Sequence, residues 1–317
     1  MRQSVSVVVP ALEDSELLER NLPPLLAILA ARGAGDEVVV VDDTGTGALA
    51  AWLAARFPPP ASFDAACVEV RCVVREENGG FQLAVRAGVE AAAHELVLLL
   101  NPDVRVEAGF LEPLVDALDD PQVVAATGRL LLAGDPSHVE SLLRPRWREG
   151  FLRMREHGAL PDDDAALESR AWFPLGGFFL ARKRDLKRQR FDPLYAPFYL
   201  EDVDLGFEWR AQGRVVAYRH DSRASHDHRG SIGSSAKGCV DIAIARNSLL
   251  FAWKHADADL LREHLDALEV HVGRAWAAGD KDALVVVAAA LDELSAASKA
   301  RARRGAGRAL RDLLLEP

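Results

Sequence analysis

Short apolar runs alternate with segments of helical periodicity along about the first 130 residues. The runs VSVVV, EVVVV, CVEVRCVV, ELVLLL and QVVAAT are each typical of a strand buried in a sheet. Between them we expect helices at about 14–33, 48–56, 82–93 and 108–118. Five strands separated by helices predict a doubly wound, mostly parallel α/β sheet.

The rest of the chain is patterned less regularly. Residues 133–170 contain the loop signals GDPSH and PDDDAA. WFPLGGFFLARK and RVVAY then indicate strands, and EDVDLGFEWRAQG between them indicates a short helix that Gly213 ends. From Lys237 onward the pattern is helical.

Composition and charge restrict the class of protein and its partners. The 317 residues are 49% hydrophobic and 27% charged, which is typical of a soluble globular protein. The net charge of -10 argues against a nucleic-acid partner. The three cysteines show neither a disulfide framework nor zinc spacing, so we expect a reducing, cytoplasmic setting. Acids directly follow the first apolar run, so it reads as a buried strand rather than a signal peptide.

Acidic residues follow two of the predicted strands. Asp42 and Asp43 follow EVVVV, and Asn101-Pro102-Asp103 follows ELVLLL. In open α/β sheets, ligands bind beyond the carboxyl ends of the strands, so we expect these acids in one crevice. There they could hydrogen-bond a base or ribose, or bind Mg²⁺ or Mn²⁺ together with substrate phosphates. Alternatively, each acid could cap the helix that follows it.

A dinucleotide fingerprint also occurs after the second strand. Residues Gly45 to Ala50 match G-x-G-x-x-A. However, two carboxylates stand directly before it and would repel a pyrophosphate, and no acid-ended strand lies about twenty residues further on. A dinucleotide-dependent dehydrogenase is therefore disfavoured.

A second group of candidate residues lies downstream. Glu201, Asp202 and Asp204 crowd at the start of a predicted helix, where the helix dipole favours negative charge. If they lie in a cleft, their mutual repulsion would raise a pKa and supply a general base. The segment SHDHRGSIGSSAKG could contact an anion or a metal, although a single histidine is usually structural. Its candidate ligands are His226, His228 and Arg229.

Taken in order, these motifs resemble the family 2 glycosyltransferases, which have the GT-A fold and use nucleotide-sugar donors. They are VSVVVPALED, VVVVDDTG, ENGGFQLAVRAGVEAA, LVLLLNPDV, LGGFFLARKRDL, FYLEDVDLGFEWRAQG and SHDHRGS. The set looks most similar to the bacterial branch that includes rhamnosyltransferases of surface polysaccharides. The resemblance implies a Rossmann-like, nucleotide-sugar-binding GT-A domain over residues 1–235, followed by a C-terminal helical region over 236–317.

The resemblance implies a donor site at the strand ends. Asp42 or Asp43 would contact the nucleobase and ribose. Asp103 would hold Mg²⁺ or Mn²⁺ at the donor diphosphate, and His226 or His228 would complete that metal site or contact the phosphates. The other donor contacts that it implies are Pro10, Ala11, Asn78, Arg229 and Asn101, which replaces the first acid of the family's D-x-D motif.

The resemblance also implies an acceptor site. Asp202 would be the catalytic base, and Gly176, Gly177 and Glu201 would lie against the acceptor. One base without an enzyme nucleophile implies single displacement, which inverts the anomeric centre. The implied activity is transfer of a sugar from a dTDP-, UDP- or GDP-linked donor to a hydroxyl of a saccharide or lipid-linked acceptor, in surface polysaccharide synthesis.

Two other functions remain as alternatives. A sugar nucleotidylyltransferase would need a glycine-rich, basic loop after the first strand, where this chain has the acidic PALEDSE. A degenerate nucleotide-sugar-binding protein is favoured by Asn101 and by Arg86, which stands where a small or amide residue is expected, but the intact EDVD opposes it.

Two basic segments raise the question of a membrane partner. RKRDLKRQR and SKARARRGAGRALRDLLL could be solvated surfaces. Alternatively, they could make peripheral contact with an anionic membrane that carries a lipid-linked acceptor.

Overall fold

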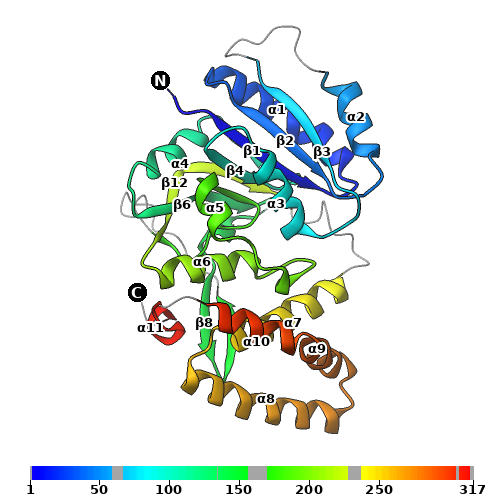
Figure 1. The fold of residues 1–317 in the computed structure, drawn as a ribbon, viewed down its shortest axis with the longest axis vertical. Helices are drawn as coiled ribbons and strands as arrows, with labels where there is room; N and C mark the ends of the chain where they lie inside the picture. The colour runs from blue at the N-terminus through cyan, green and yellow to red at the C-terminus, as the bar shows by residue number, and fades with distance from the viewer. Residues whose placement is uncertain are drawn as a thin grey trace.

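The computed structural model describes residues 2–58, 67–133, 135–155, 170–227, 237–304 and 307–314. A ten-stranded sheet forms its centre, in the order β10-β12-β6-β11-β4-β1-β2-β3, with β5 on β12 and β7 on β6 (Figure 1). Its strands are β1 (Val5–Ala11), β2 (Glu37–Asp42), β3 (Glu69–Val74), β4 (Leu96–Leu100), β5 (Val104–Val106), β6 (Val123–Leu132), β7 (Asp135–Val139), β10 (Arg170–Ala171), β11 (Phe178–Arg182) and β12 (Val215–His226).

Helices cover both faces of this sheet. The valines and leucines of β1, β2 and β4 alternate between the two faces, so each face carries its own apolar core. One face packs against α1 (Ser15–Arg32), α2 (Ala48–Arg56) and α4 (Leu111–Ala117). The other packs against α3 (Phe81–Ala91), α5 (Lys183–Arg188) and one side of α6 (Glu201–Ala211).

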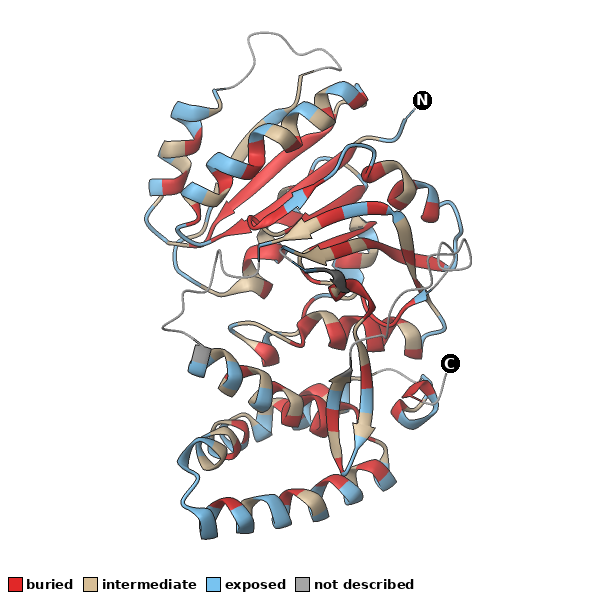
Figure 2. Cartoon of the chain, turned by 180° about the vertical axis from the view of Figure 1, so that it is seen from behind, coloured by how far each residue is buried: buried red, intermediate tan, exposed pale blue. Residues whose placement is uncertain are grey.

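A third core lies between α6 and the C-terminal helices. Leu205 and Trp209 of α6 face the sheet, whereas Val203 and Phe207 face the third core, so α6 is buried on both sides (Figure 2). The division predicted at residue 235 remains a prediction, and this core extends across it. Its further elements are β8 (Arg144–Arg148), β9 (Phe151–Arg155), η3 (Pro193–Tyr195), α7 (Lys237–His255), α8 (Ala258–Ala278), α9 (Lys281–Asp292), α10 (Leu294–Arg303) and α11 (Leu310–Leu314). The short helix η1 (Glu140–Leu142) instead packs Leu142 against the sheet.

The predicted strands and helices are present, with three corrections. β11 inserts antiparallel between β4 and β6, because an apolar run predicts burial but carries no strand direction. The helix predicted at 108–118 starts only at Leu111, since Gly109 has a φ of 79°. The strand predicted as RVVAY continues to His226; its second half buries only small residues, Ser222 and Ala224, and therefore shows no apolar run.

No helix in the described ranges is long and apolar enough to cross a membrane.

The packing of α3 on the sheet gives a stability prediction. A Cβ atom at Gly88 would lie 2.3 Å from Val8 Cγ1 and 3.0 Å from Val41 Cγ2. Gly88→Ala should therefore lower the free energy of unfolding by about 1–3 kcal/mol through overpacking. The matched control is Gly273→Ala on exposed α8, where nothing lies within 4 Å, and it should be neutral or stabilising by up to about 1 kcal/mol. Equal urea midpoints for the two variants would contradict this packing.

Candidate active site

The carboxyl ends of β1, β2 and β4 meet at one edge of the sheet, as the sequence predicts. β1 is parallel to both neighbours, and its last residue, Ala11, pairs in register with Asp42. The Asp43 amide donates to the Ala11 carbonyl oxygen at 3.1 Å. Pro10 and Ala11 therefore lie beside the acids of β2, and Asn101 follows β4 at the same edge.

Asp42 is fully buried at this edge. Its Oδ1 accepts hydrogen bonds from the Thr44 amide at 3.0 Å and from the Thr44 hydroxyl at 2.6 Å. Its Oδ2 has no hydrogen-bond partner among the described residues. The carboxylate is thus held in one orientation, with one acceptor oxygen that the described protein does not use.

Asp43 orders the turn that leads into α3. Its carboxylate pairs with the Arg75 guanidinium at 2.6 Å and accepts from the amides of Gly79 at 3.2 Å and Gly80 at 2.9 Å. Asn78 supports the same turn, because its Oδ1 accepts from the Gly80 amide at 3.0 Å. The donor contacts predicted for Asp43 and Asn78 remain predictions.

Asp103 and His226 are brought together by the pairing of β5 with β12. Val104 lies opposite His226, and the Asp227 amide donates to the Asp103 carbonyl at 3.0 Å. Asp103 Oδ1 then lies 3.3 Å from His226 Nε2, and the other ring nitrogen lies 2.6 Å from Glu140 Oε2. The imidazole is therefore fixed between two carboxylates.

The electrostatics of this group suit a cation. Burial opposes a charge on His226, but its hydrogen bonds with Asp103 and Glu140 outweigh that effect and raise its pKa to about 10. Without a metal, a proton on the imidazole therefore neutralises part of this negative charge.

The donor atoms of Asp103 and His226 also fit Mg²⁺ or Mn²⁺. One carboxylate oxygen and one imidazole nitrogen are suitable when substrate phosphates complete the coordination. Within the described ranges, no three His, Cys, Asp or Glu side chains are grouped as metal ligands. His228 and Arg229 lie outside the described residues, so their predicted roles remain predictions.

Two glycines connect this edge of the sheet to α6. The Asn101 amide donates to the Gly177 carbonyl at 2.9 Å, and a Cβ at Gly177 would lie 2.7 Å from Asn101 Nδ2. The Gly176 amide donates to Asp202 Oδ2 at 2.9 Å. Gly176 and Gly177 thus lie between Asn101 and Asp202, and their predicted contact with an acceptor remains a prediction.

Glu201 and Asp202 are adjacent acids with different environments. Burial raises the pKa of Asp202 to about 6, although N–H groups of Gly176 and Val203 favour its charged form. Burial and the charge of Asp202 raise the pKa of Glu201 well above its usual value, and its side chain accepts a long hydrogen bond from Gln82 at 3.4 Å. At neutral pH Asp202 is therefore mostly ionised, and both burial and this charge oppose ionisation of Glu201.

Tyr199 links the two groups of acids. Burial raises the pKa of its phenol, followed by the negative charges of Glu201, Asp103 and Glu140. The acids on α6 and the acids beside His226 therefore both act electrostatically on this phenol.

Asp204, the third acid of α6, is part of a buried ion cluster instead. It contacts Lys254 Nζ at 2.8 Å, His255 Nε2 at 2.5 Å and the Tyr195 hydroxyl at 2.8 Å. Burial opposes its charge, but Lys254 and His255 outweigh that effect and lower its pKa. Burial lowers the pKa of His255 to about 4, so this imidazole is neutral and donates to Asp204.

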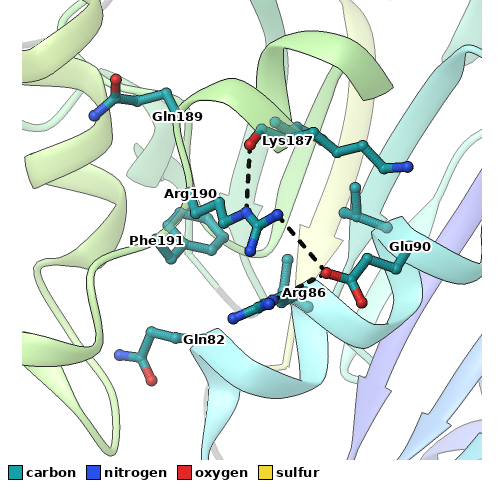
Figure 3. Close-up of a pocket in the computed structure, with 10 residues that line it drawn as sticks. Gln82, Arg86, Glu90, Lys187, Gln189, Arg190 and Phe191 are labelled. Atoms are coloured by element: carbon teal, nitrogen blue, oxygen red, sulfur yellow. Dashed lines mark hydrogen bonds and ion pairs between the residues drawn. The ribbon is translucent and has the colours of Figure 1, made fainter.

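A small pocket between α3 and α5 adjoins this site through Gln82, which also contacts Glu201 (Figure 3). Arg86 pairs there with Glu90 at 3.0 Å, and Arg190 lies 3.9 Å from the same carboxylate. Arg86 therefore belongs to the outer surface of α3.

Several residues of the site have no distinct sequence signal. Glu140 and Gln82 are single polar residues whose partners lie 86 and 119 positions away in the chain. Arg75 stands just before ENGG, and Tyr199 lies within the motif FYLEDVDLGFEWRAQG, so their positions relative to these motifs could have indicated them.

Comparison with known proteins agrees with this geometry. The sequence model of "Glycosyl transferase family 2" matches residues 6–189, more than half of the chain. The chain belongs to glycosyl transferase family 2. Asp42, Asp103 and Gly176 fall within the matched segment of this family 2 chain, whereas Asp202 and His226 lie beyond it.

The curated relatives are uncharacterized glycosyltransferases. One from Mycobacterium bovis and one from Mycobacterium tuberculosis are each 34% identical over 172 residues, which cover 51% of this family 2 chain. The alignment spans 65% of each relative's length.

Solved structures show the same GT-A fold. GalNAc-T7 in complex with UDP, GalNAc and Mn²⁺ superposes with a TM-score of 0.58 at 16% identity, over 81% of this chain and 48% of that one. The mannosyltransferase PcManGT from Pyrobaculum calidifontis, in complex with GDP-Man and Mn²⁺, has a TM-score of 0.54 at 18% identity, over 93% and 76%. TarS 1-349 of S. aureus has a TM-score of 0.52 at 17% identity, over 83% and 71%.

The different environments of Asp202 and Asp204 give a second prediction. Asp204→Asn leaves buried Lys254 with Asp192 as its remaining carboxylate partner, so it should lower the free energy of unfolding by about 3 kcal/mol. Asp202→Asn keeps one acceptor oxygen for its amide donors and should cost only about 1 kcal/mol. Guanidinium denaturation of both variants checks this, and an equal loss would mean that Asp204 is not a structural ion.

Proposed function

We propose that this chain is an inverting, metal-dependent glycosyltransferase that moves a sugar from a nucleotide-diphosphate donor to a hydroxyl of a saccharide or lipid-linked acceptor. The observation that carries the proposal is the environment of Asp202, a partly exposed residue of α6 whose carboxylate accepts from the Gly176 amide. Its pKa of about 6 suits a general base at neutral pH, and Gly176 ties it to the strand-end crevice.

The donor side is proposed at the carboxyl ends of β1, β2 and β4. Asp42 or Asp43 contacts the nucleobase and ribose, beside Pro10 and Ala11. Asp103 and His226 would hold Mg²⁺ or Mn²⁺, which when bound stabilises negative charge on the leaving diphosphate. Glu140 orients the His226 ring through its second nitrogen.

The acceptor side is proposed at α6. Asp202 takes the proton of the acceptor hydroxyl as that oxygen attacks the anomeric carbon. Burial and the charge of Asp202 raise the pKa of Glu201, so Glu201 resists ionisation beside the base and is proposed to lie against the acceptor. With one base and no enzyme nucleophile, a single displacement inverts the anomeric centre.

The proposal also extends to the identity of the donor, the acceptor and the biological role. UDP and GDP-Man are bound in related folds, which supports testing UDP-, GDP- and dTDP-linked sugars. We propose a role in surface polysaccharide synthesis, with a sugar such as rhamnose as the transferred group. Exposed Arg184, Lys187 and Arg188 of α5 support peripheral contact with an anionic membrane that carries a lipid-linked acceptor.

Replacing the proposed base tests the reaction. Asp202→Asn should reduce transfer by about 10²- to 10⁴-fold, the usual contribution of a positioned base. Nucleotide affinity should be retained, since the donor is held from the strand ends. Release of UDP, GDP or dTDP from the matching nucleotide sugar, with Mn²⁺ and a saccharide panel, measures the rate. A rate within a few-fold of wild type would remove Asp202 from this role.

The pH profile provides a control on the same residue. A base must be ionised, so kcat/KM of the wild type should rise with pH through about 6 and level off above it. The Asp202→Asn variant should lack this limb. A limb that persists in the variant would assign the titration to another group.

The metal and nucleotide sites are tested by melting temperature. With Mn²⁺, one of UDP, GDP or dTDP should stabilise the wild type by about 2.7 kcal/mol at a hundredfold excess over its dissociation constant. Asp103→Ala should remove the metal-dependent part of that shift and keep the rest. Asp42→Asn and Asp43→Asn, measured side by side, should reveal which acid contacts the nucleoside. No response to any nucleotide would contradict the donor site.

A further inference from the structure

Two adjacent side chains of α7 bind the chain segment 195–199, which leads into α6. Asn247 Nδ2 lies 2.8–3.0 Å from three carbonyl oxygens of this segment, and Arg246 Nη2 donates to a fourth. The four oxygens belong to Tyr195, Ala196, Phe198 and Tyr199. Within five residues, four carbonyl groups are therefore bound from another helix.

The Asn247 amide can make these contacts in only one orientation. Its Oδ1 accepts from Arg246 Nε at 3.0 Å and from Nη2 at 2.8 Å. A guanidinium only donates and carbonyl oxygens only accept, so Oδ1 must face the arginine while Nδ2 faces the segment. Asn247 is fully buried, so water cannot substitute for its contacts.

The bound segment has an unusual backbone. Tyr199 and Leu200 have φ angles of 73° and 68°, in the left-handed region that residues other than glycine rarely adopt. Such residues persist where the surrounding structure holds them. The Leu200 carbonyl accepts from the Asp204 amide at 2.9 Å, which starts α6. The conformation of these two residues therefore sets where Glu201 and Asp202 lie.

We propose that Asn247, oriented by Arg246, is a positioning residue for the reaction. It holds segment 195–199 so that Asp202 stays bound to the Gly176 amide and faces the acceptor. This inference rests on the proposed role of Asp202 as the base. If Asn247 has this role, the alignment of the base depends on α7, which lies beyond the segment matched to the family.

The kinetic test compares Asn247→Ala with a control of similar stability. Asn247→Ala should lower kcat by about 10- to 100-fold, because a displacement of about 1 Å has that effect. The donor KM should change by less than about threefold, since the donor site lies on the sheet. Leu268→Ala, in the same core but remote from the segment, should match the loss of melting temperature and keep kcat. Equal kcat in the two variants would overturn the proposal.

A double variant tests whether Asn247 acts through the base. Asp202→Asn combined with Asn247→Ala should lose no more activity than Asp202→Asn alone, because there is no base left to position. Losses that multiply would show that Asn247 acts by another route and would overturn the proposal.

Hydrogen exchange tests the inference without any substrate. The amides of Gly176 and Val203 donate to the Asp202 carboxylate and therefore report its position. Both amides should exchange about tenfold faster in Asn247→Ala and, by a smaller factor, in the milder variant Arg246→Lys. Their exchange should not change in Leu268→Ala. Wild-type protection in both Asn247→Ala and Arg246→Lys would overturn the proposal, whatever the activity. If transfer survives in Asp202→Asn but these amides lose protection in Asn247→Ala, the assignment of Asp202 as the base is wrong and the positioning contact of Asn247 is retained.

Discussion

The site depends on a difference in how readily three acids within one helical turn ionise: Glu201, Asp202 and Asp204. Burial disfavours the ionised form of all three, and α6 has packed layers on both sides. Asp204 pairs with Lys254 and is held as an ion, whereas Asp202 accepts from the amides of Gly176 and Val203 and has a pKa of about 6. Glu201 has no cationic partner among the causes of its shift, and burial with the charge of Asp202 raises its pKa. The partners of α6 therefore decide which acid can accept a proton.

The sequence was informative where the structure is local or periodic. Apolar runs located the strands, and the strand-end rule placed Asp42 and Asp103 at one edge of the sheet. Prediction from sequence failed where the direction of a strand or small buried side chains determine the structure. The apolar run of β11 carries no information about strand direction, so its antiparallel insertion could not be predicted. The polar half of β12 has no hydrophobic pattern, yet it carries His226 to Asp103.

The remaining features of the site depend on contacts between distant parts of the chain. In sequence, Glu140 and Asn247 carry no signal that shows which groups they contact. Their burial arises only when η1 reaches β12 and α7 reaches the segment before α6. The sequence likewise grouped Asp202 with Asp204, because adjacent acids look equivalent until Lys254 is seen beside one of them.

The two halves of the site belong to different cores, which has a consequence for how such a chain can diverge. Asp103 follows strands packed in the sheet core, whereas Asp202 begins a helix packed against the C-terminal helices. Substitutions in cores that share no partners have nearly independent effects, so the helical side can accumulate changes while the strand-end side is conserved. Two features still couple the two sides. Helix α6 also packs Leu205 and Trp209 against the sheet, and Leu175 packs against both cores and directly precedes Gly176. A lineage that alters Leu175 has to readjust both sides of the site together.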